Sequence, residues 1–142
     1  MRRIRAILAP LALALILAVP AGAGAAEADR AAIRSVIEQQ LDAFRRDDAR
    51  EAFTYASPTI REKFGDPATF MRMVRQSYRP VYRPSAVEFR NLARQDGRMA
   101  QHVFIVGPEG RAVIAVYLMA QQDEGTWRID GVYLTDVPDE AV

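Results

Sequence analysis

The apolar residues of this chain change their spacing at Pro84, and the change decides which folds are open to it. Before Pro84 they recur every three or four residues, as in an amphipathic helix. After Pro84 four apolar runs have the period of two that is typical of β-strands, and glycine-containing turns separate them. Helices followed by an antiparallel meander predict an α+β domain, with the helices packed on one face of a curved four-stranded sheet.

The helical half is predicted to start with one long helix that is capped by Asp29 and ends near Arg46. Its apolar stripe consists of Ile33, Val36, Ile37, Leu41 and Phe44. Three shorter helices follow, and each is preceded by a side chain that can accept a hydrogen bond from the first turn. Their predicted ranges are Ala49 to Ala56 after Asp48, Pro58 to Gly65 after Ser57, and Pro67 to Tyr78 after Asp66.

The segment QSYRPVYRP, residues 76–84, connects the two halves. Arg79 and Arg83 each precede a proline, and a residue in that position is disfavoured in a helix. We therefore expect the helix to stop after Tyr78 and the chain to continue extended into the sheet. The segment is then a rigid connector that can also form the rim of a pocket.

The first predicted strand contains Val87 and Phe89, and Asp96-Gly97 is typical of the tight turn that follows. The other three strands are predicted over Met99 to Val106, Ala112 to Gln121 and Thr126 to Leu134.

The third of these strands is apolar on both faces. One face carries Val113, Ala115, Tyr117 and Met119, and the other carries Ala112, Ile114, Val116 and Leu118. One face meets the helices, so something else must cover the other. We expect a homodimer through this outer face; the alternative is that the curved sheet covers itself with its own loops.

Residues 1–26 have the three parts of a secretory signal peptide: arginines at the start, an apolar run over residues 7–19, and small residues before the cleavage site. The apolar run is shorter than the roughly 20 residues that span a bilayer, although an uncleaved anchor is the alternative. We expect cleavage near Ala25 or Ala26 and a periplasmic or secreted product with no membrane span. The mature chain then has one domain over residues 27–135 and a flexible tail over residues 136–142.

Composition excludes several classes of site. The chain has no cysteine, so it has no disulfide, thiolate metal site or cysteine nucleophile. Loss of Arg2, Arg3 and Arg5 with the signal reduces the 19 basic residues to 16, against 18 acidic ones, and this slightly acidic balance disfavours nucleic-acid binding. No spacing of histidines and carboxylates indicates a metal site, and no glycine-rich phosphate loop is present, so no metal or cofactor is expected.

Two stretches resemble known families. The first helix ending in LDAFRRDD, together with WRIDG at residues 127–131, resembles the nuclear transport factor 2-like superfamily. QQLDAFRRDDAREAFTYASPTIREKFG followed by FMRMVRQSYRPVYRP resembles the exported bacterial family catalogued as domain of unknown function 4864. The first resemblance implies a cystatin-like cone with a space between helices and sheet, and dimers through the sheet face. The second implies no particular activity.

Enzymes of the superfamily place an acid or a histidine inside the cone, which makes Asp130 and His102 the catalytic candidates. If Trp127 and Ile129 face the helices, Asp130 points to the outer face. His102 shares the parity of Ala100 and Phe104, which we take as the face toward the cone. A base beside a tyrosine hydroxyl would suit an isomerase, dehydratase or hydrolase; the alternative is a structural role for both residues.

The candidates for a ligand pocket are Tyr55, Met71, Tyr78, Arg79, Tyr82 and His102. Ordinary core packing is the alternative for Met71 and Tyr78, and ion pairing with Asp66 or Glu88 is the alternative for the arginines. The function predicted is that of an exported, non-catalytic domain that binds a small apolar or anionic ligand or a partner protein. The alternatives are a small enzyme with a His102 or Asp130 base, and a purely structural dimerisation module.

Overall fold

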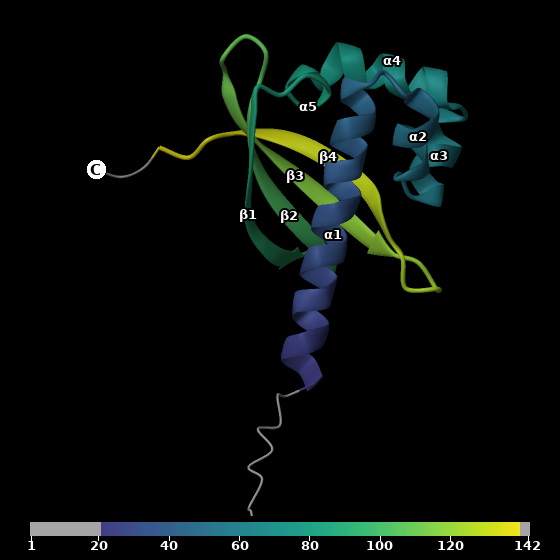
Figure 1. Cartoon of the computed structure of the whole chain (residues 1–142), viewed down its shortest axis with the longest axis vertical. Coiled ribbons are helices and arrows are strands. Elements are labelled where there is room, and N and C mark those ends of the chain that lie inside the picture. Colours follow the sequence, from purple (N-terminus) through teal and green to yellow (C-terminus); the bar gives the residue numbers. More distant parts are fainter. Residues whose placement is uncertain (1–20, 140–142) are drawn as a thin grey trace, which may run out of the picture.

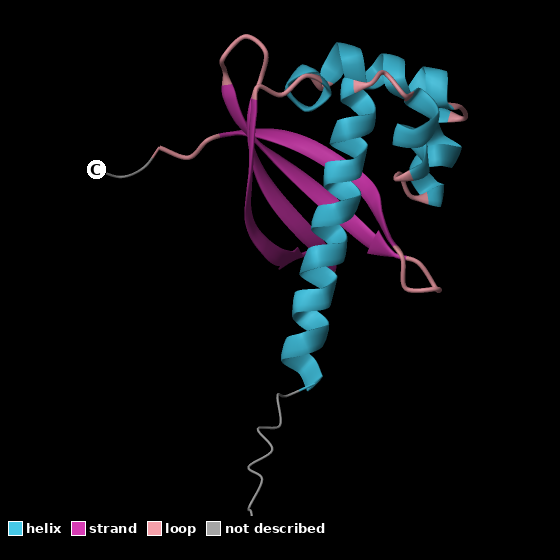
Figure 2. Ribbon diagram, viewed as in Figure 1, coloured by secondary structure: helices cyan, strands magenta, loops and turns pink. Residues whose placement is uncertain are grey.

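A computed structural model describes residues 21–139, and within them five helices precede four strands (Figure 1). The helices are α1 (Ala21–Arg45), α2 (Ala49–Thr54), α3 (Pro58–Phe64), α4 (Pro67–Ser77) and α5 (Arg79–Tyr82). The strands are β1 (Ala86–Gln95), β2 (Arg98–Val106), β3 (Ala112–Gln121) and β4 (Trp127–Asp136). The strands form one antiparallel sheet in the order β1-β2-β3-β4, and the helices pack against it (Figure 2). The predicted α+β fold is confirmed.

The short helices begin at the predicted caps. Asp48 Oδ1 accepts a hydrogen bond from Glu51 N at 3.0 Å, Ser57 Oγ one from Ile60 N at 3.2 Å, and Asp66 Oδ1 one from Thr69 N at 2.8 Å. A proline occupies the first turn of α3 and of α4. These side chains satisfy backbone N–H groups that have no partner inside the helix, which fixes where each helix starts.

The start of α1 differs from the prediction. The helix begins at Ala21 rather than after Asp29, because the preceding small residues are mostly alanine and continue the helix. Asp29 therefore caps nothing, and its carboxylate instead accepts a hydrogen bond from Trp127 Nε1 at 3.3 Å. Residues 22–28 are exposed, and α1 extends beyond the sheet in Figure 1. Most of the predicted signal peptide, residues 1–20, lies outside the described residues.

No described helix is both long and apolar enough to span a membrane.

The connector after α4 is not extended as predicted. The helix does end at Ser77, but residues 79–82 form one further helical turn, α5. Pro80 is tolerated there because it lies in the first turn, where its missing N–H is not needed. The chain leaves the helical conformation at Tyr78, between α4 and α5, and again at Arg83, before the second proline.

β3 matches its predicted range, and β2 starts one residue earlier, at Arg98. β4 starts at Trp127 rather than Thr126 and runs two residues beyond Leu134, where Asp136 pairs with Val113. Asp96 and Gly97 connect β1 to β2 with φ angles of 49° and 78°, as a tight hairpin turn requires. Register shifts between Phe89 and Leu92 in β1 and beside Leu118 in β3 bend the sheet.

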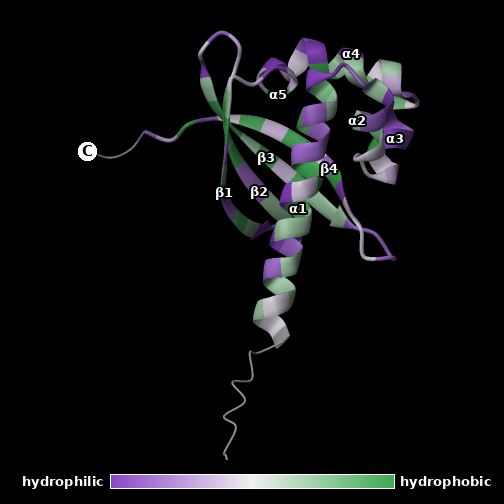
Figure 3. Cartoon of the chain, in the orientation of Figure 1, coloured by the Kyte–Doolittle hydropathy of each residue, from purple (hydrophilic) through white to green (hydrophobic). Residues whose placement is uncertain are grey.

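The two faces of β3 divide as predicted. Val113, Ala115, Tyr117 and Met119 belong to the main core beneath the helices, and hydrophobic positions follow the strands behind α1 (green in Figure 3). Ile114, Val116 and Ala100 form a second cluster on the outer face, with Phe104, Leu118 and Val137 packed against it. The single chain thus buries much of its own outer face, and the homodimer stays a prediction.

The Tyr117 hydroxyl is buried and has no hydrogen-bond partner among the described residues, and burial raises its pKa. We expect Tyr117→Phe to raise the free energy of unfolding by about 1 kcal/mol, because it removes an unsatisfied polar group and keeps the ring. Urea unfolding measures this. Tyr78→Phe is the control: it removes a hydroxyl that donates to Val132 O at 2.9 Å and should lower stability by a similar amount. A loss of stability in Tyr117→Phe would contradict the expectation.

Candidate functional site

A cavity of about 160 Å³ lies between the helices and β4, at the end of the sheet that α3 and α4 cover. It is lined by Gln40, Phe44, Ala56, Ile60, Lys63, Phe64, Phe70, Met73, Val74, Tyr78, Val81, Ile129, Gly131 and Val132. Most of these side chains are apolar, and none is acidic. The wall therefore suits an apolar group.

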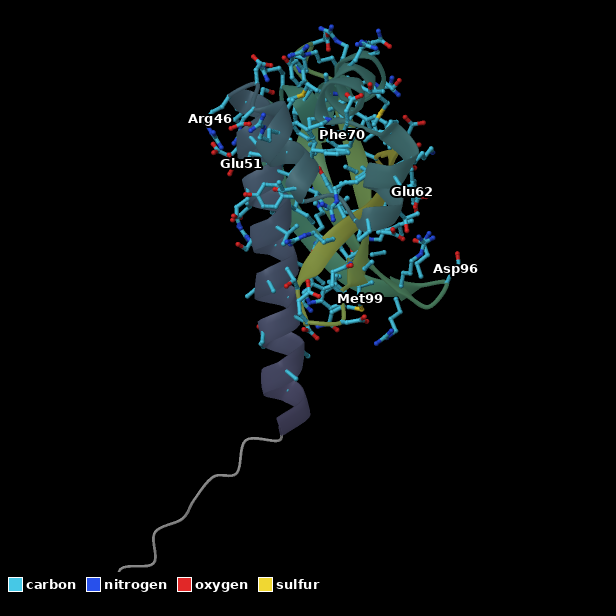
Figure 4. The ribbon with its side chains drawn as sticks, turned by 90° about the vertical axis from the view of Figure 1, so that its right-hand side faces the viewer. Arg46, Glu51, Glu62, Phe70, Asp96 and Met99 are labelled. Carbon is cyan, nitrogen blue, oxygen red and sulfur yellow. The ribbon has the colours of Figure 1, made fainter. Side chains whose placement is uncertain are left out.

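Phe70 of α4 organises the helical side of the cavity. Its ring centroid lies 6.2 Å from that of Phe44, 5.5 Å from that of Phe53 and 5.8 Å from that of Phe64. Figure 4 shows Phe70 in the interior of the helical end, whereas Glu62 of α3 lies at the periphery. Packed aromatic rings with fixed geometry make this wall stiff.

The second wall, α3, is attached to β4 through the residues that precede the helix. Ser57 N donates to Ile129 O and Ile129 N donates to Tyr55 O, both at 2.8 Å, as part of a short parallel bridge. The Ser57 hydroxyl also donates to Asp130 Oδ1 at 2.7 Å. These bonds hold Ile60 and Phe64 against the cavity.

Three polar side chains reach the cavity. Tyr78 donates its hydroxyl proton to Val132 O, and Gln40 Nε2 donates to Ala52 O at 3.1 Å. Lys63 is exposed, and its ammonium lies 5.5 Å from the ring centroid of Phe64. It forms no ion pair with any residue in the described part of the chain.

Over residues 26–142 the chain matches the family described as Domain of unknown function (DUF4864). The chain belongs to this family. Neither the curated proteins nor the solved structures contain a match. The cone superfamily thus stays an expectation with which the fold is compatible, and the function of this DUF4864 domain has to be argued from its own site.

Of the six predicted pocket residues, Tyr78 lies in the wall of the cavity. Met71 is buried in the core of the DUF4864 domain, and Met73, two residues later, lines the cavity instead. Tyr55 lies on the side of α1 and α2, where its hydroxyl donates to Glu51 Oε1 at 3.0 Å or Gln39 Oε1 at 3.1 Å. Neither Met71 nor Tyr55 lines this cavity, and a binding role for them stays a prediction.

Tyr82 also lies away from the cavity, in a charged cluster at the end of α1. Its hydroxyl donates to Asp47, and the guanidinium of Arg83 lies 4.0 Å from the centre of its ring. Hydrogen bonds from Tyr82 and Arg75, together with the charge of Arg83, lower the pKa of Asp47. The cluster ties α4 and α5 to the turn between α1 and α2.

Arg79 and Arg83 form ion pairs, as the alternative to a pocket role predicted, but their partners differ from the predicted ones. Arg79 Nη2 lies 2.6 Å from Glu109 Oε1, and Arg83 Nη2 lies 2.8 Å from Asp47 Oδ2. Neither Asp66 nor Glu88 is involved in these contacts.

The two catalytic candidates do not face the cavity. His102 lies on the outer face beside Val116, so its predicted orientation toward the cone was wrong; Gln101, Val103 and Ile105 occupy the inner face instead. Asp130 is bound to Ser57 and forms an ion pair with Arg98 at 3.1 Å. Neither residue lines the cavity beside the Tyr78 hydroxyl. The enzyme alternative, which requires a base beside a tyrosine hydroxyl, stays a prediction.

Within residues 21–139 no three histidine, aspartate or glutamate side chains lie close enough together to hold a metal ion.

Sequence reasoning missed Lys63 as a residue of the cavity lining, although one signal was available. It is the only lysine in a chain with 19 lysine and arginine residues.

Proposed function

We propose that this DUF4864 domain is a non-catalytic binding protein that holds a small apolar group in the cavity between α3, α4 and β4. The observation that carries the proposal is the cavity itself, a space partly open to solvent whose wall is mostly apolar. An apolar cavity of roughly 150 Å³ takes up benzene or xenon. A purely structural module would fill this space with its own side chains.

We infer that the domain acts after export. Residues 22–28, around the expected cleavage site, are exposed, and Asp29 is held by Trp127. Cleavage near Ala25 or Ala26 therefore removes no contact of the core. N-terminal sequencing of the exported protein tests this, and a mature chain that starts beyond Asp29 would contradict it.

Xenon tests the proposed site directly, because it enters apolar cavities regardless of the natural ligand. We expect dissolved xenon to shift the methyl NMR signals of Ile60, Val74 and Val132 in the wild-type protein. Val74→Phe fills the cavity and should abolish the response. Val106→Phe makes the same change on the outer face and should leave the response intact.

Circular dichroism verifies that both variants are folded. Wild-type protein without any xenon response, or a Val74→Phe variant that responds like the wild type, would refute the site.

A further inference from the structure

The charge around the cavity is one-sided. Its lining contains one cationic side chain, Lys63, and no carboxylate. A charged group at the edge of an apolar space acts through a lower effective dielectric constant than it would in water, so it selects the sign of a ligand's charge. A cationic ligand is therefore disfavoured at this site.

Lys63 forms no ion pair within the described chain, as is also true of Arg61, but Lys63 lines the cavity and Arg61 does not. Arg79, Arg83 and Arg98 each form an ion pair. The side chain of Lys63 lies beside Phe64, which itself lines the cavity. A lysine can place its apolar stem along such a wall while its ammonium stays in water, which puts the charge at the rim.

The other two polar side chains of the cavity already donate hydrogen bonds to backbone carbonyl groups. The hydroxyl proton of Tyr78 is held by Val132 O, and the amide nitrogen of Gln40 by Ala52 O. The interior thus favours an apolar group, and the rim favours a negative one.

We infer that the natural ligand is an amphiphilic monocarboxylate, whose carboxylate pairs with Lys63 while an apolar part of about six carbons fills the cavity. One ammonium balances one negative charge, which favours a carboxylate over a phosphate monoester with a charge of about −2. The inference rests on the proposed function, because it requires that the cavity binds an apolar group.

Hexanoate, pentanol and pentylamine test the inference, because they share a pentyl chain and differ in the charge of the head group. Each is titrated at pH 7 and low salt, and the methyl NMR signals of the cavity report the dissociation constant. We expect hexanoate to bind most tightly and pentylamine least tightly. The ratio of hexanoate to pentanol affinity should fall about 2- to 5-fold in Lys63→Gln, which corresponds to a partly exposed ion pair.

Lys63→Arg should keep the preference for hexanoate, and Arg61→Gln, on the same helix but outside the lining, is the matched control that should also keep it. An unchanged ratio in Lys63→Gln, or equal changes in Lys63→Gln and Arg61→Gln, would overturn the inference and leave the apolar site intact. Absence of binding by all three compounds, together with absence of a xenon response, would overturn the proposed function as well.

Discussion

Phe70→Ala is expected to lower the free energy of unfolding by about 3–5 kcal/mol, the usual cost of removing a buried phenylalanine. Phe70 is 6% exposed and contacts the rings of Phe44, Phe53 and Phe64. Truncation removes all three ring contacts and joins the new space to the existing cavity. Small domains have a free energy of unfolding of only about 5–15 kcal/mol. Urea unfolding should therefore show that the variant has lost a large part of its stability.

Phe104→Ala is the matched control, since Phe104 is half-buried on the outer face beneath the guanidinium of Arg90. It should cost about 1 kcal/mol, because much less apolar area returns to water. Phe70→Leu should stay folded and increase the xenon response, which links the loss of stability to the cavity. Equal losses in the two alanine variants would show that Phe70 does not organise the wall.

The helical half of the fold could be predicted from local chemistry. Asp48, Ser57 and Asp66 each accept a hydrogen bond within the first turn that follows, so the start of each helix depends on residues a few positions apart. The same reasoning failed at Asp29, because its partner Trp127 is distant in the sequence and the alanines before it continue the helix.

Which face of β2 packs against the helices could not be predicted, because both faces of that strand carry apolar residues. Ala100 and Phe104 on one side are as compatible with a core as Val103 and Ile105 on the other. Alternation of side chains indicates a strand, but it does not say which face points to the core when both faces are apolar. The misplacement of His102 follows from this ambiguity.

The cavity was harder still to predict, because α1, α3, α4 and β4 all contribute to it. A space left between side chains depends on how these elements pack, and no local pattern encodes it. Tyr78 was found because it ends a helix beside the sheet, whereas Met73 and Lys63 carry no periodic signal that separates them from their neighbours.

Asp130→Ala is expected to lower the free energy of unfolding by about 1.5–3 kcal/mol, the range for hydrogen bonds to a charged group. The Asp130 side chain is 20% exposed and accepts hydrogen bonds from Ser57 Oγ at 2.7 Å and Arg98 Nη1 at 3.1 Å. Alanine leaves the buried Ser57 hydroxyl without its acceptor. Urea unfolding measures the loss, and Asp130→Asn, which keeps an acceptor oxygen, should lose less.

Asp136→Ala gives the matched control on the same strand. Asp136 also pairs with an arginine, Arg111, but its side chain is 87% exposed, so the loss should stay below about 1 kcal/mol. A double-mutant cycle with Ser57→Ala isolates the bond from Ser57 to Asp130, and a coupling near zero would show that this bond contributes nothing. A clear coupling would give Asp130 the role of fixing α3, the helix that carries Lys63, to the sheet. Asp130→Ala should then also weaken hexanoate binding, although Asp130 does not line the cavity.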